Sequence, residues 1–315
     1  MFNFGILGGV YSGWALGSND SANIFGTSVG SRAIKYTTAI LLTSIFVILG
    51  SLLEGPQTMD TVSNLTKLSG WMPFIAAASA ALTITFMTVV SIPASTSQAI
   101  IGALIGIGFA NNNPSFNGLL KIVICWIGTP VGAALISFLL YHFLGYFFNK
   151  IKNIYVHDRV LKILIILSGC YGAYSLGANN VANTMGVFVG QPFLGLSMTK
   201  MQAAAIGGLS IALGTMTFSK KVMETVGKKI TPMSPFGSFI TMISMAITVH
   251  IYTLIGVPVS TSQAIVGTVV GVGIIKGLRA VSFKMVYLIG ISWVLTPTLA
   301  AIISFLLMRG GAAIF

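Results

Sequence analysis

Two uncharged stretches of this chain run far longer than any single element of a soluble fold. No lysine, arginine, aspartate or glutamate occurs from Leu68 to Leu120 or from Ile230 to Ile275. One helix crosses the hydrocarbon core of a bilayer with about 20 apolar residues, so each stretch has room for two crossings. Charged residues make up 7% of the 315 residues, against about 25% in soluble domains. The sequence therefore predicts an all-α integral membrane protein.

Hydrophobic patterning predicts about ten membrane spans. They cover residues 3–29, 34–53, 71–92, 95–110, 119–147, 160–186, 200–219, 235–257, 260–276 and 284–308. Thirteen of the 17 lysines and arginines follow odd-numbered spans, so the positive-inside tendency places those loops in the cytoplasm and both termini outside. The net charge of +12 lies in these loops and does not indicate a nucleic-acid surface. The uncharged turns near Ile92 and Val257 are expected to be short re-entrant breaks within the membrane.

The chain contains an internal duplication. Residues Gly17–Gly30 and Gly177–Gly190 are identical at seven of fourteen positions. Residues Pro93–Ile100 match Pro258–Ile265 with a single difference, Ala94 against Val259. Because the matches recur in the same order along the chain, two copies of one unit are expected.

Each copy has five expected spans, an odd number, so the second copy must enter the membrane from the other side. We expect a first repeat at 1–148, a cytoplasmic linker at 149–159 and a second, inverted repeat at 160–315. Inverted repeats are typical of secondary transporters, whose substrate and ion sites lie near the midplane where helices of the two halves break.

Asp20 is the only acidic residue inside an expected span. An ionisable group at such depth is costly, and its default interpretation is functional. Gly17, Ser18 and Asn19 precede it and Asn23 follows, and such residues are poor helix formers. We expect the helix to unwind there and expose carbonyl groups. The alternative is a glycine-based helix crossing with hydrogen bonds between asparagines.

The segments Pro93–Gln98 and Pro258–Gln263 each place Ser-Thr-Ser after a proline, where a helix would begin. The first turn of a helix offers unpaired N–H groups and the positive end of the helix dipole, which together bind anions. The alternative is that these hydroxyl groups join neighbouring helices. The near-identical second copy favours an anion site.

No lysine or arginine lies in the interior of an expected span. A multivalent anion would meet helix termini worth about half a charge each. Co-bound cations can supply the missing positive charge, and oxygen-rich side chains are their ligands. Cation-coupled symport is therefore favoured over uniport. No catalytic triad, nucleotide loop or metal-ligand cluster occurs, so we expect neither an enzyme nor a cofactor other than the coupled ion.

At these motifs the chain resembles the inorganic phosphate transporter family of sodium- or proton-coupled symporters. The residues that carry the resemblance are Gly17–Asn23, Gly177–Asn183 and the two Pro-x-Ser-Thr-Ser-Gln-Ala segments. It implies import of inorganic phosphate across the plasma membrane with Na⁺, or with H⁺ as a variant, by a protein in the form of a homodimer. Many family members have aspartate where Asn180 stands, which is a departure of this chain.

The resemblance implies two sets of site residues. The expected phosphate ligands are Asn23, Ser95, Thr96, Ser97, Asn183, Ser260, Thr261 and Ser262. The expected cation ligands are Asn19, Asp20, Gln98, Asn179, Asn180 and Gln263. Uptake of sulfate or another tetrahedral oxyanion is the nearest alternative. An anion channel, and a membrane enzyme or scaffold, are more distant ones.

Overall fold

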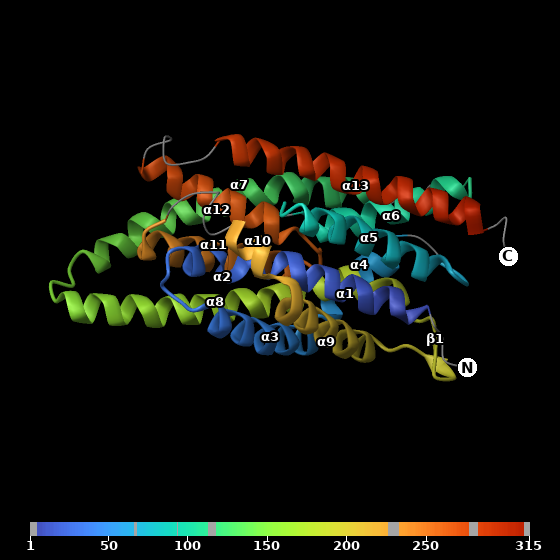
Figure 1. Ribbon diagram of the computed structural model, residues 1–315, viewed down its shortest axis with the longest axis horizontal. Helices are drawn as coiled ribbons and strands as arrows, with labels where there is room; N and C mark the ends of the chain where they lie inside the picture. Colours follow the sequence, from blue (N-terminus) through green and yellow to red (C-terminus); the bar gives the residue numbers. More distant parts are fainter. Residues whose placement is uncertain are drawn as a thin grey trace.

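The protein is a bundle of long helices, most of which run along its longest axis (Figure 1). The computed structural model describes residues 5–65, 68–92, 94–112, 118–225, 233–276 and 283–311. Pro93, expected to end a helix, lies outside these ranges, as do the loop residues Lys67, Lys228, Lys229 and Arg279.

The described elements include thirteen α-helices, one 3₁₀ turn and one short hairpin. The helices are α1 (Ile6–Asp20), α2 (Ala22–Gly30), α3 (Tyr36–Leu53), α4 (Pro56–Ser63), α5 (Met72–Val89), α6 (Thr96–Ala110), α7 (Leu119–Phe148), α8 (Ile154–Met185), α9 (Lys200–Phe218), α10 (Lys220–Thr225), α11 (Pro235–Leu254), α12 (Thr261–Lys276) and α13 (Phe283–Gly311). The turn η1 (Gly186–Phe188) follows α8, and β1 (Pro192–Phe193) pairs antiparallel with β2 (Leu196–Ser197).

Seven described helices have the length and apolar composition of a membrane span: α3, α5, α7, α8 (with η1), α9, α11 and α13. The helices α6 and α12 are apolar but shorter, and α1 and α2 share the first expected span. The all-helical membrane architecture predicted from the sequence is confirmed. Ten complete crossings are not, and the ten-span layout stays a prediction.

The expected unwinding around Asp20 is much smaller than the sequence suggested. The helix is interrupted only at Ser21, whose backbone angles (φ −59°, ψ −25°) stay in the right-handed helical region. The matching segment Gly177–Asn183 lies wholly inside α8. The glycines have a different use, which is close contact with another helix.

Four glycines lie where helices from the two halves of the chain cross. A Cβ atom added to Gly17 in α1 would overlap the backbone carbonyl of Ile211 in α9. The matching Gly177 in α8 meets the carbonyl of Val47 in α3 in the same way. Gly214 and Gly50 complete the two crossings from the opposite helices, against Trp14 and Tyr174. The two crossings are therefore reciprocal.

The helices that carry the Ser-Thr-Ser segments also use glycines for close contact with a helix of the other half. Gly102 of α6 packs against the backbone of Pro297 in α13, and Gly267 of α12 packs against Pro130 in α7. Each of these short helices thus lies against a long helix of the other half of the chain. Gly106 and Gly271, each four residues further on, lie against the backbone of Ala301 and Ala134, so both GxxxG pairs act as close-packing surfaces.

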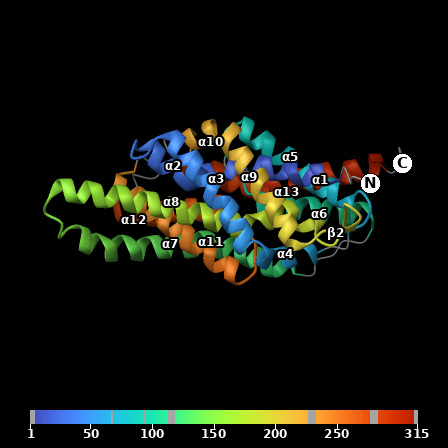
Figure 2. The same cartoon turned by 90° about the horizontal axis from the view of Figure 1, so that it is seen from below.

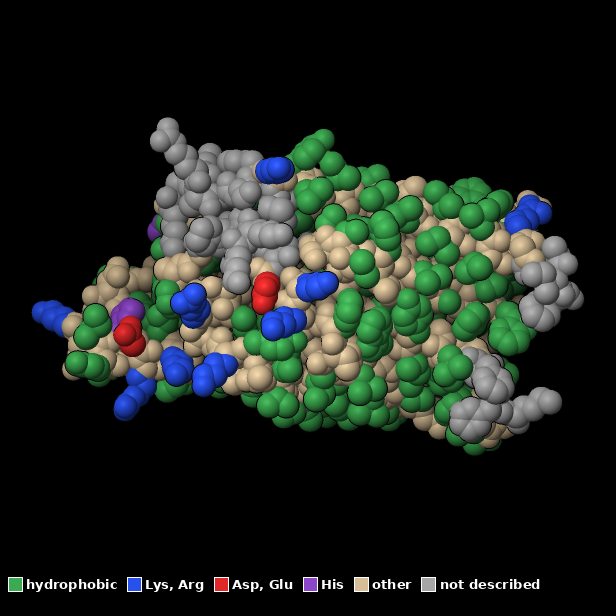
Figure 3. All heavy atoms as spheres, in the orientation of Figure 1, with side chains coloured by type: hydrophobic (Ala, Val, Ile, Leu, Met, Phe, Trp, Pro, Cys, Tyr) green, Lys and Arg blue, Asp and Glu red, His purple; other side chains and the backbone are tan. Residues whose placement is uncertain are grey.

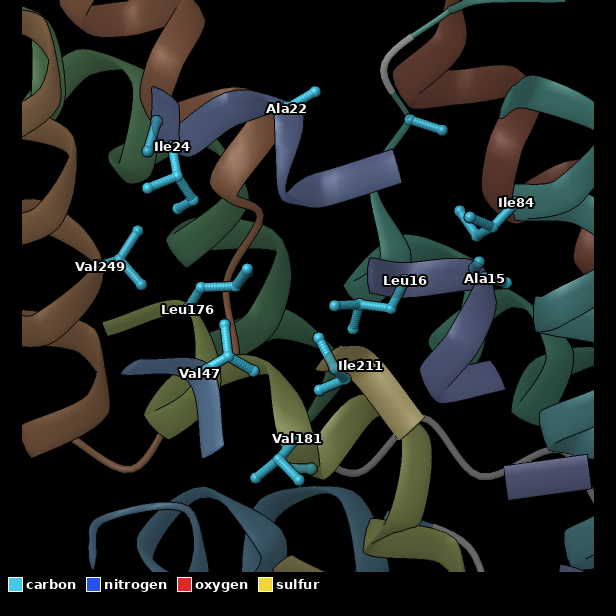
Figure 4. Packing of buried hydrophobic residues seen from close by; sticks show 14 of the residues in the cluster. Ala15, Leu16, Ala22, Ile24, Val47, Ile84, Leu176, Val181, Ile211 and Val249 are labelled. Carbon is cyan, nitrogen blue, oxygen red and sulfur yellow. The ribbon is translucent and has the colours of Figure 1, made fainter. Parts of the chain in front are cut away.

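The core between the halves is built from matching residues of the two copies (Figure 4). Leu16 and Leu176 lie near the centre of the view, and Ile84 and Val249 lie on opposite sides of it. All four side chains are fully buried. The two copies share one core.

Many large apolar side chains are exposed on the outer surface, and the basic side chains on the face drawn in Figure 3 gather toward one end. Leu120, Ile127 and Val294 on α7 and α13 are among the exposed large hydrophobic side chains, at 73%, 66% and 70%. Figure 3 shows most of the visible lysine and arginine side chains over the half that carries the α7–α8 connection. That connection lies at the opposite end from the start of α1 and the end of α13 (Figures 1 and 2).

Candidate functional site

The two Ser-Thr-Ser segments meet at one buried carboxylate. Asp20, the last residue of α1, is 1% exposed. Thr96, the first residue of α6, donates a hydrogen bond to Asp20 Oδ2 at 2.9 Å. Thr261, the first residue of α12, has its hydroxyl against the same carboxyl. Residues far apart in the sequence are therefore brought to a single point.

Each of these two helices begins with a serine cap. Ser95 Oγ accepts a hydrogen bond from the Gln98 backbone N–H at 3.2 Å, and Ser260 Oγ accepts one from Gln263 at 3.2 Å. Ser97 and Ser262 are hydrogen-bonded to these cap hydroxyls, at 3.2 and 2.8 Å. The caps leave other first-turn N–H groups of both helices without an intrahelical partner. Two positive helix ends are therefore directed at the neighbourhood of Asp20.

Asn19 holds the segment that leads into α6. Its Nδ2 donates to Thr88 Oγ1 at 2.9 Å and to the Ile92 carbonyl at 3.3 Å, and its Oδ1 accepts from the Ala94 N–H at 3.0 Å. These contacts fix the chain just before the cap at Ser95. The side chain thus positions the start of the helix.

Asn179 repeats this arrangement in the second half. Its Nδ2 donates to Thr253 Oγ1 and to the Val257 carbonyl, both at 3.1 Å, and its Oδ1 accepts from the Val259 N–H at 2.7 Å. Asn19 and Asn179 are therefore positioning residues in this structure. Their expected role as cation ligands stays a prediction.

Five side-chain oxygens of the expected site residues are buried and have no hydrogen-bond partner in the part of the chain that the structure describes. They are Asp20 Oδ1, Asn23 Oδ1, Gln98 Oε1, Asn183 Oδ1 and Gln263 Oε1. Leaving one buried polar atom unpaired costs about 1–3 kcal/mol. Five such atoms among the expected ligands indicate a ligand-binding site, and carboxylate and amide oxygens are suited to hard cations.

The remaining polar groups are partly paired. Asn23 Nδ2 donates to Thr261 Oγ1 at 3.5 Å, which links α2 to α12. Asn183 Nδ2 donates to Asn180 Oδ1 at 2.8 Å within α8. Asn180 Nδ2 is buried and has no partner among the described residues. The structure thus connects Asp20, Thr96, Thr261 and Asn23 through side-chain contacts, whereas the contacts of Asn180 and Asn183 are with each other.

The site is closed and contains no basic side chain among the described residues. Among the residues that the structure describes, Asp20 is the only charged one with a buried side chain. Thr96, Thr261 and Asn23 are each 1% exposed. An anion bound here would be held by hydroxyl groups, amides and helix N-termini, and its charge would be balanced from outside the protein.

A second polar cluster was not expected from the sequence. His250 Nε2 lies 2.8 Å from Glu54 Oε2, and Tyr171 Oη lies 2.7 Å from His250 Nδ1. Glu54 directly follows an expected span, at a loop position, yet its side chain is only 22% exposed. Glu54 and His250 stand 196 positions apart, and no local pattern signals such a pair.

Comparison with known proteins places these features in context. The sequence model of the phosphate transporter family matches residues 16–304. A proposed phosphate permease of Methanocaldococcus jannaschii is 32% identical over 98% of this chain and 97% of its own. A sulfate permease of Bacillus subtilis is 30% identical over 96% of this chain and 86% of its own. A solved structure described as the sodium-dependent phosphate transporter is 26% identical, with a TM-score of 0.87 and 99% of both chains covered.

Proposed function

The chain belongs to the phosphate transporter family, and we propose that it is a secondary active transporter that imports inorganic phosphate together with Na⁺. The observation that carries this proposal is the meeting of two helix N-termini with one carboxylate in a closed site. The helix ends suit a tetrahedral anion, and the unpaired oxygens around them suit its cations.

Charge balance supports symport. A phosphate dianion beside the Asp20 carboxylate would bring three negative charges together, against about half a positive charge from each of the two helix ends. Repulsion in a buried site of low dielectric constant is strong. Cations that bind with the anion relieve it, and they bind better when the anion is present. Na⁺ is favoured because a solved structure with a TM-score of 0.87 to this chain is described as sodium-dependent. H⁺ is the alternative coupled ion.

The closed site also requires movement. A substrate reaches residues that are 1% exposed only if helices separate on one side of the membrane at a time. The reciprocal packing of the halves supports two inverted repeats, 1–148 and 160–315, joined by a cytoplasmic linker at 149–159. We further propose that the protein lies in the plasma membrane with both termini outside, and that two copies form a homodimer.

Uptake into reconstituted vesicles tests the proposal. Phosphate should accumulate when an inward Na⁺ gradient is imposed at equal pH on both sides, and accumulation should cease when the gradient is abolished. Uptake driven by a pH gradient alone would identify H⁺ as the coupled ion. Uptake that is indifferent to both gradients and does not saturate would point to a channel and overturn the proposal.

Sulfate transport is the second candidate, because a sulfate permease is nearly as similar to this chain as the proposed phosphate permease. Hydroxyl groups and helix N-termini bind both anions. Uptake of each labelled anion by itself distinguishes the two: a phosphate transporter accumulates labelled phosphate, whereas a transporter for sulfate alone accumulates labelled sulfate and leaves phosphate outside.

A further inference from the structure

Among the expected site residues, the two copies differ in residue type at one matching position. Asp20 and Asn180 are equivalent residues of the matching segments Gly17–Gly30 and Gly177–Gly190. Both side chains are buried, at 1% and 0% exposure. Asp20 brings a negative charge and an unpaired acceptor, Oδ1. Asn180 brings no charge and an unpaired donor, Nδ2.

The donor end of Asn180 is left free by its neighbour. Asn183 Nδ2 donates to Asn180 Oδ1 at 2.8 Å, which fixes the amide so that its oxygen is used and its nitrogen is not. The helix α8, which carries Asn180, packs against α1, α2 and α6, the helices that carry Asp20, Asn23 and Thr96. A buried amide N–H without a partner costs about 1–3 kcal/mol, which a ligand oxygen would recover.

Tetrahedral anions differ in the hydrogen bonds that they can form with a side chain at this position. Sulfate and selenate carry no proton near neutral pH, so all of their oxygens accept hydrogen bonds. Phosphate and arsenate carry at least one hydroxyl group, which also donates. An amide N–H serves the oxygens of either kind, whereas a carboxylate at the same place would repel a proton-free oxygen and accept only from a hydroxyl.

We propose that Asn180 is a specificity-determining residue that opens this site to proton-free tetrahedral dianions such as sulfate, in addition to phosphate. This inference rests on the proposed function as an oxyanion transporter. Asn180 also lowers the negative charge of the site by one relative to an aspartate, so that a dianion needs fewer co-bound cations.

Competition by four anions tests the proposal in Asn180→Asp. In the unsubstituted protein, sulfate, selenate, arsenate and unlabelled phosphate should each inhibit uptake of labelled phosphate. In Asn180→Asp, the inhibition constants for sulfate and selenate should rise about tenfold or more, because a buried partner of the wrong polarity discriminates strongly. Inhibition by arsenate should be retained. Phosphate uptake by the variant should also rise as the pH falls and the anion gains a second hydroxyl.

Two further variants separate specificity from folding. Asn180→Ser keeps a donor and should keep inhibition by sulfate. Asn153→Asp makes the same chemical change at the exposed N-cap of α8, where aspartate caps as well as asparagine, and should leave all four inhibition constants unchanged. If Asn180→Asp shows no uptake, binding can be measured on the purified protein instead. Ligands stabilise the folded state by mass action, so the increases in melting temperature caused by sulfate and by arsenate report how well each anion binds relative to the other.

Two results would overturn the proposal. One is an equal rise of all four inhibition constants in Asn180→Asp, and the other is the absence of inhibition by sulfate in the unsubstituted protein. A failure of the proposed function looks different. If the unsubstituted protein accumulates sulfate and not phosphate, phosphate import is wrong, and the ratio of sulfate to arsenate binding in the variant still decides the role of Asn180.

Discussion

Thr96 donates a hydrogen bond to the Asp20 carboxylate across 76 positions of sequence and from a different helix. The contact joins the end of α1 to the start of α6, and the Thr261 hydroxyl adds the start of α12 to the same carboxyl. Among the described residues, Oδ1 of this carboxylate has no hydrogen-bond partner. A buried charge in a membrane span is costly, so Asp20 is the site residue with the greatest need for a bound partner.

Replacing Asp20 with asparagine should abolish cation-dependent uptake or lower it strongly. The variant keeps an acceptor for Thr96 but removes the only buried charge of the described site. The measurement is labelled phosphate uptake under a Na⁺ gradient, normalised to protein in the membrane. Asp60→Asn is the matched control, because Asp60 forms an exposed ion pair with Lys200 at 2.6 Å, and such pairs contribute little. Normal coupled uptake by Asp20→Asn would show that the carboxylate is not a transport ligand.

Replacing Gly17 with alanine should destabilise the folded protein. The added methyl group would overlap the carbonyl of Ile211 and force α1 away from α9. Overpacking of this kind costs about 1–3 kcal/mol, and a lower melting temperature of the purified protein measures it. Gly132→Ala in α7 is the control, since a Cβ there meets no atom within 4 Å. Equal melting temperatures for the two variants would contradict the close crossing.

Replacing Asn179 with alanine should weaken anion binding. The Val259 N–H and the Val257 carbonyl would both lose their side-chain partner, and each unpaired buried group costs about 1–3 kcal/mol. The start of α12 would no longer be held in place, so the KM for phosphate should rise. Thr217→Ala provides the comparison, because Thr217 makes its contact with Trp14 on an exposed part of the surface. An unchanged KM in Asn179→Ala would refute the positioning role.

Replacing His250 with alanine should destabilise the protein without stopping transport. Glu54 and Tyr171 would each lose a partner in a largely buried setting, at a cost of about 1–3 kcal/mol. His157→Ala is the control, because the contact of His157 is with Asp158, whose side chain is 76% exposed. Uptake by His250→Ala with a changed dependence on pH would instead assign this cluster a part in proton coupling.

The sequence predicted the site residues best in the segments that occur in both copies. The two copies of Ser-Thr-Ser-Gln and of the segment around Asp20 led directly to residues that the fold brings together, since Thr96 and Thr261 both lie at Asp20. The same comparison, extended to the helices before α6 and α12, would have found Thr88 and Thr253. These threonines accept hydrogen bonds from Asn19 and Asn179 in matching ways.

The sequence was less informative about how helices behave at glycine. Gly17 and Asn19 are poor helix formers in isolation, and that property predicted unwinding. In the folded protein, packing of Gly17 on Ile211 outweighs local propensity and keeps the helix intact as far as Asp20. The Glu54–His250 pair could not be predicted for a related reason, because it depends on how α3 and α11 both pack against α8.

The reciprocal glycine crossings have a consequence for how the protein is made. The α1 helix precedes two of its partners in the chain, because α9 covers Gly17 and α12 brings Thr261 to Asp20. A chain that ends before α12 therefore holds the Asp20 carboxyl without its full set of hydrogen-bond partners. The described contacts of the Asp20 carboxyl are therefore complete only after α12, which begins at Thr261, has been inserted.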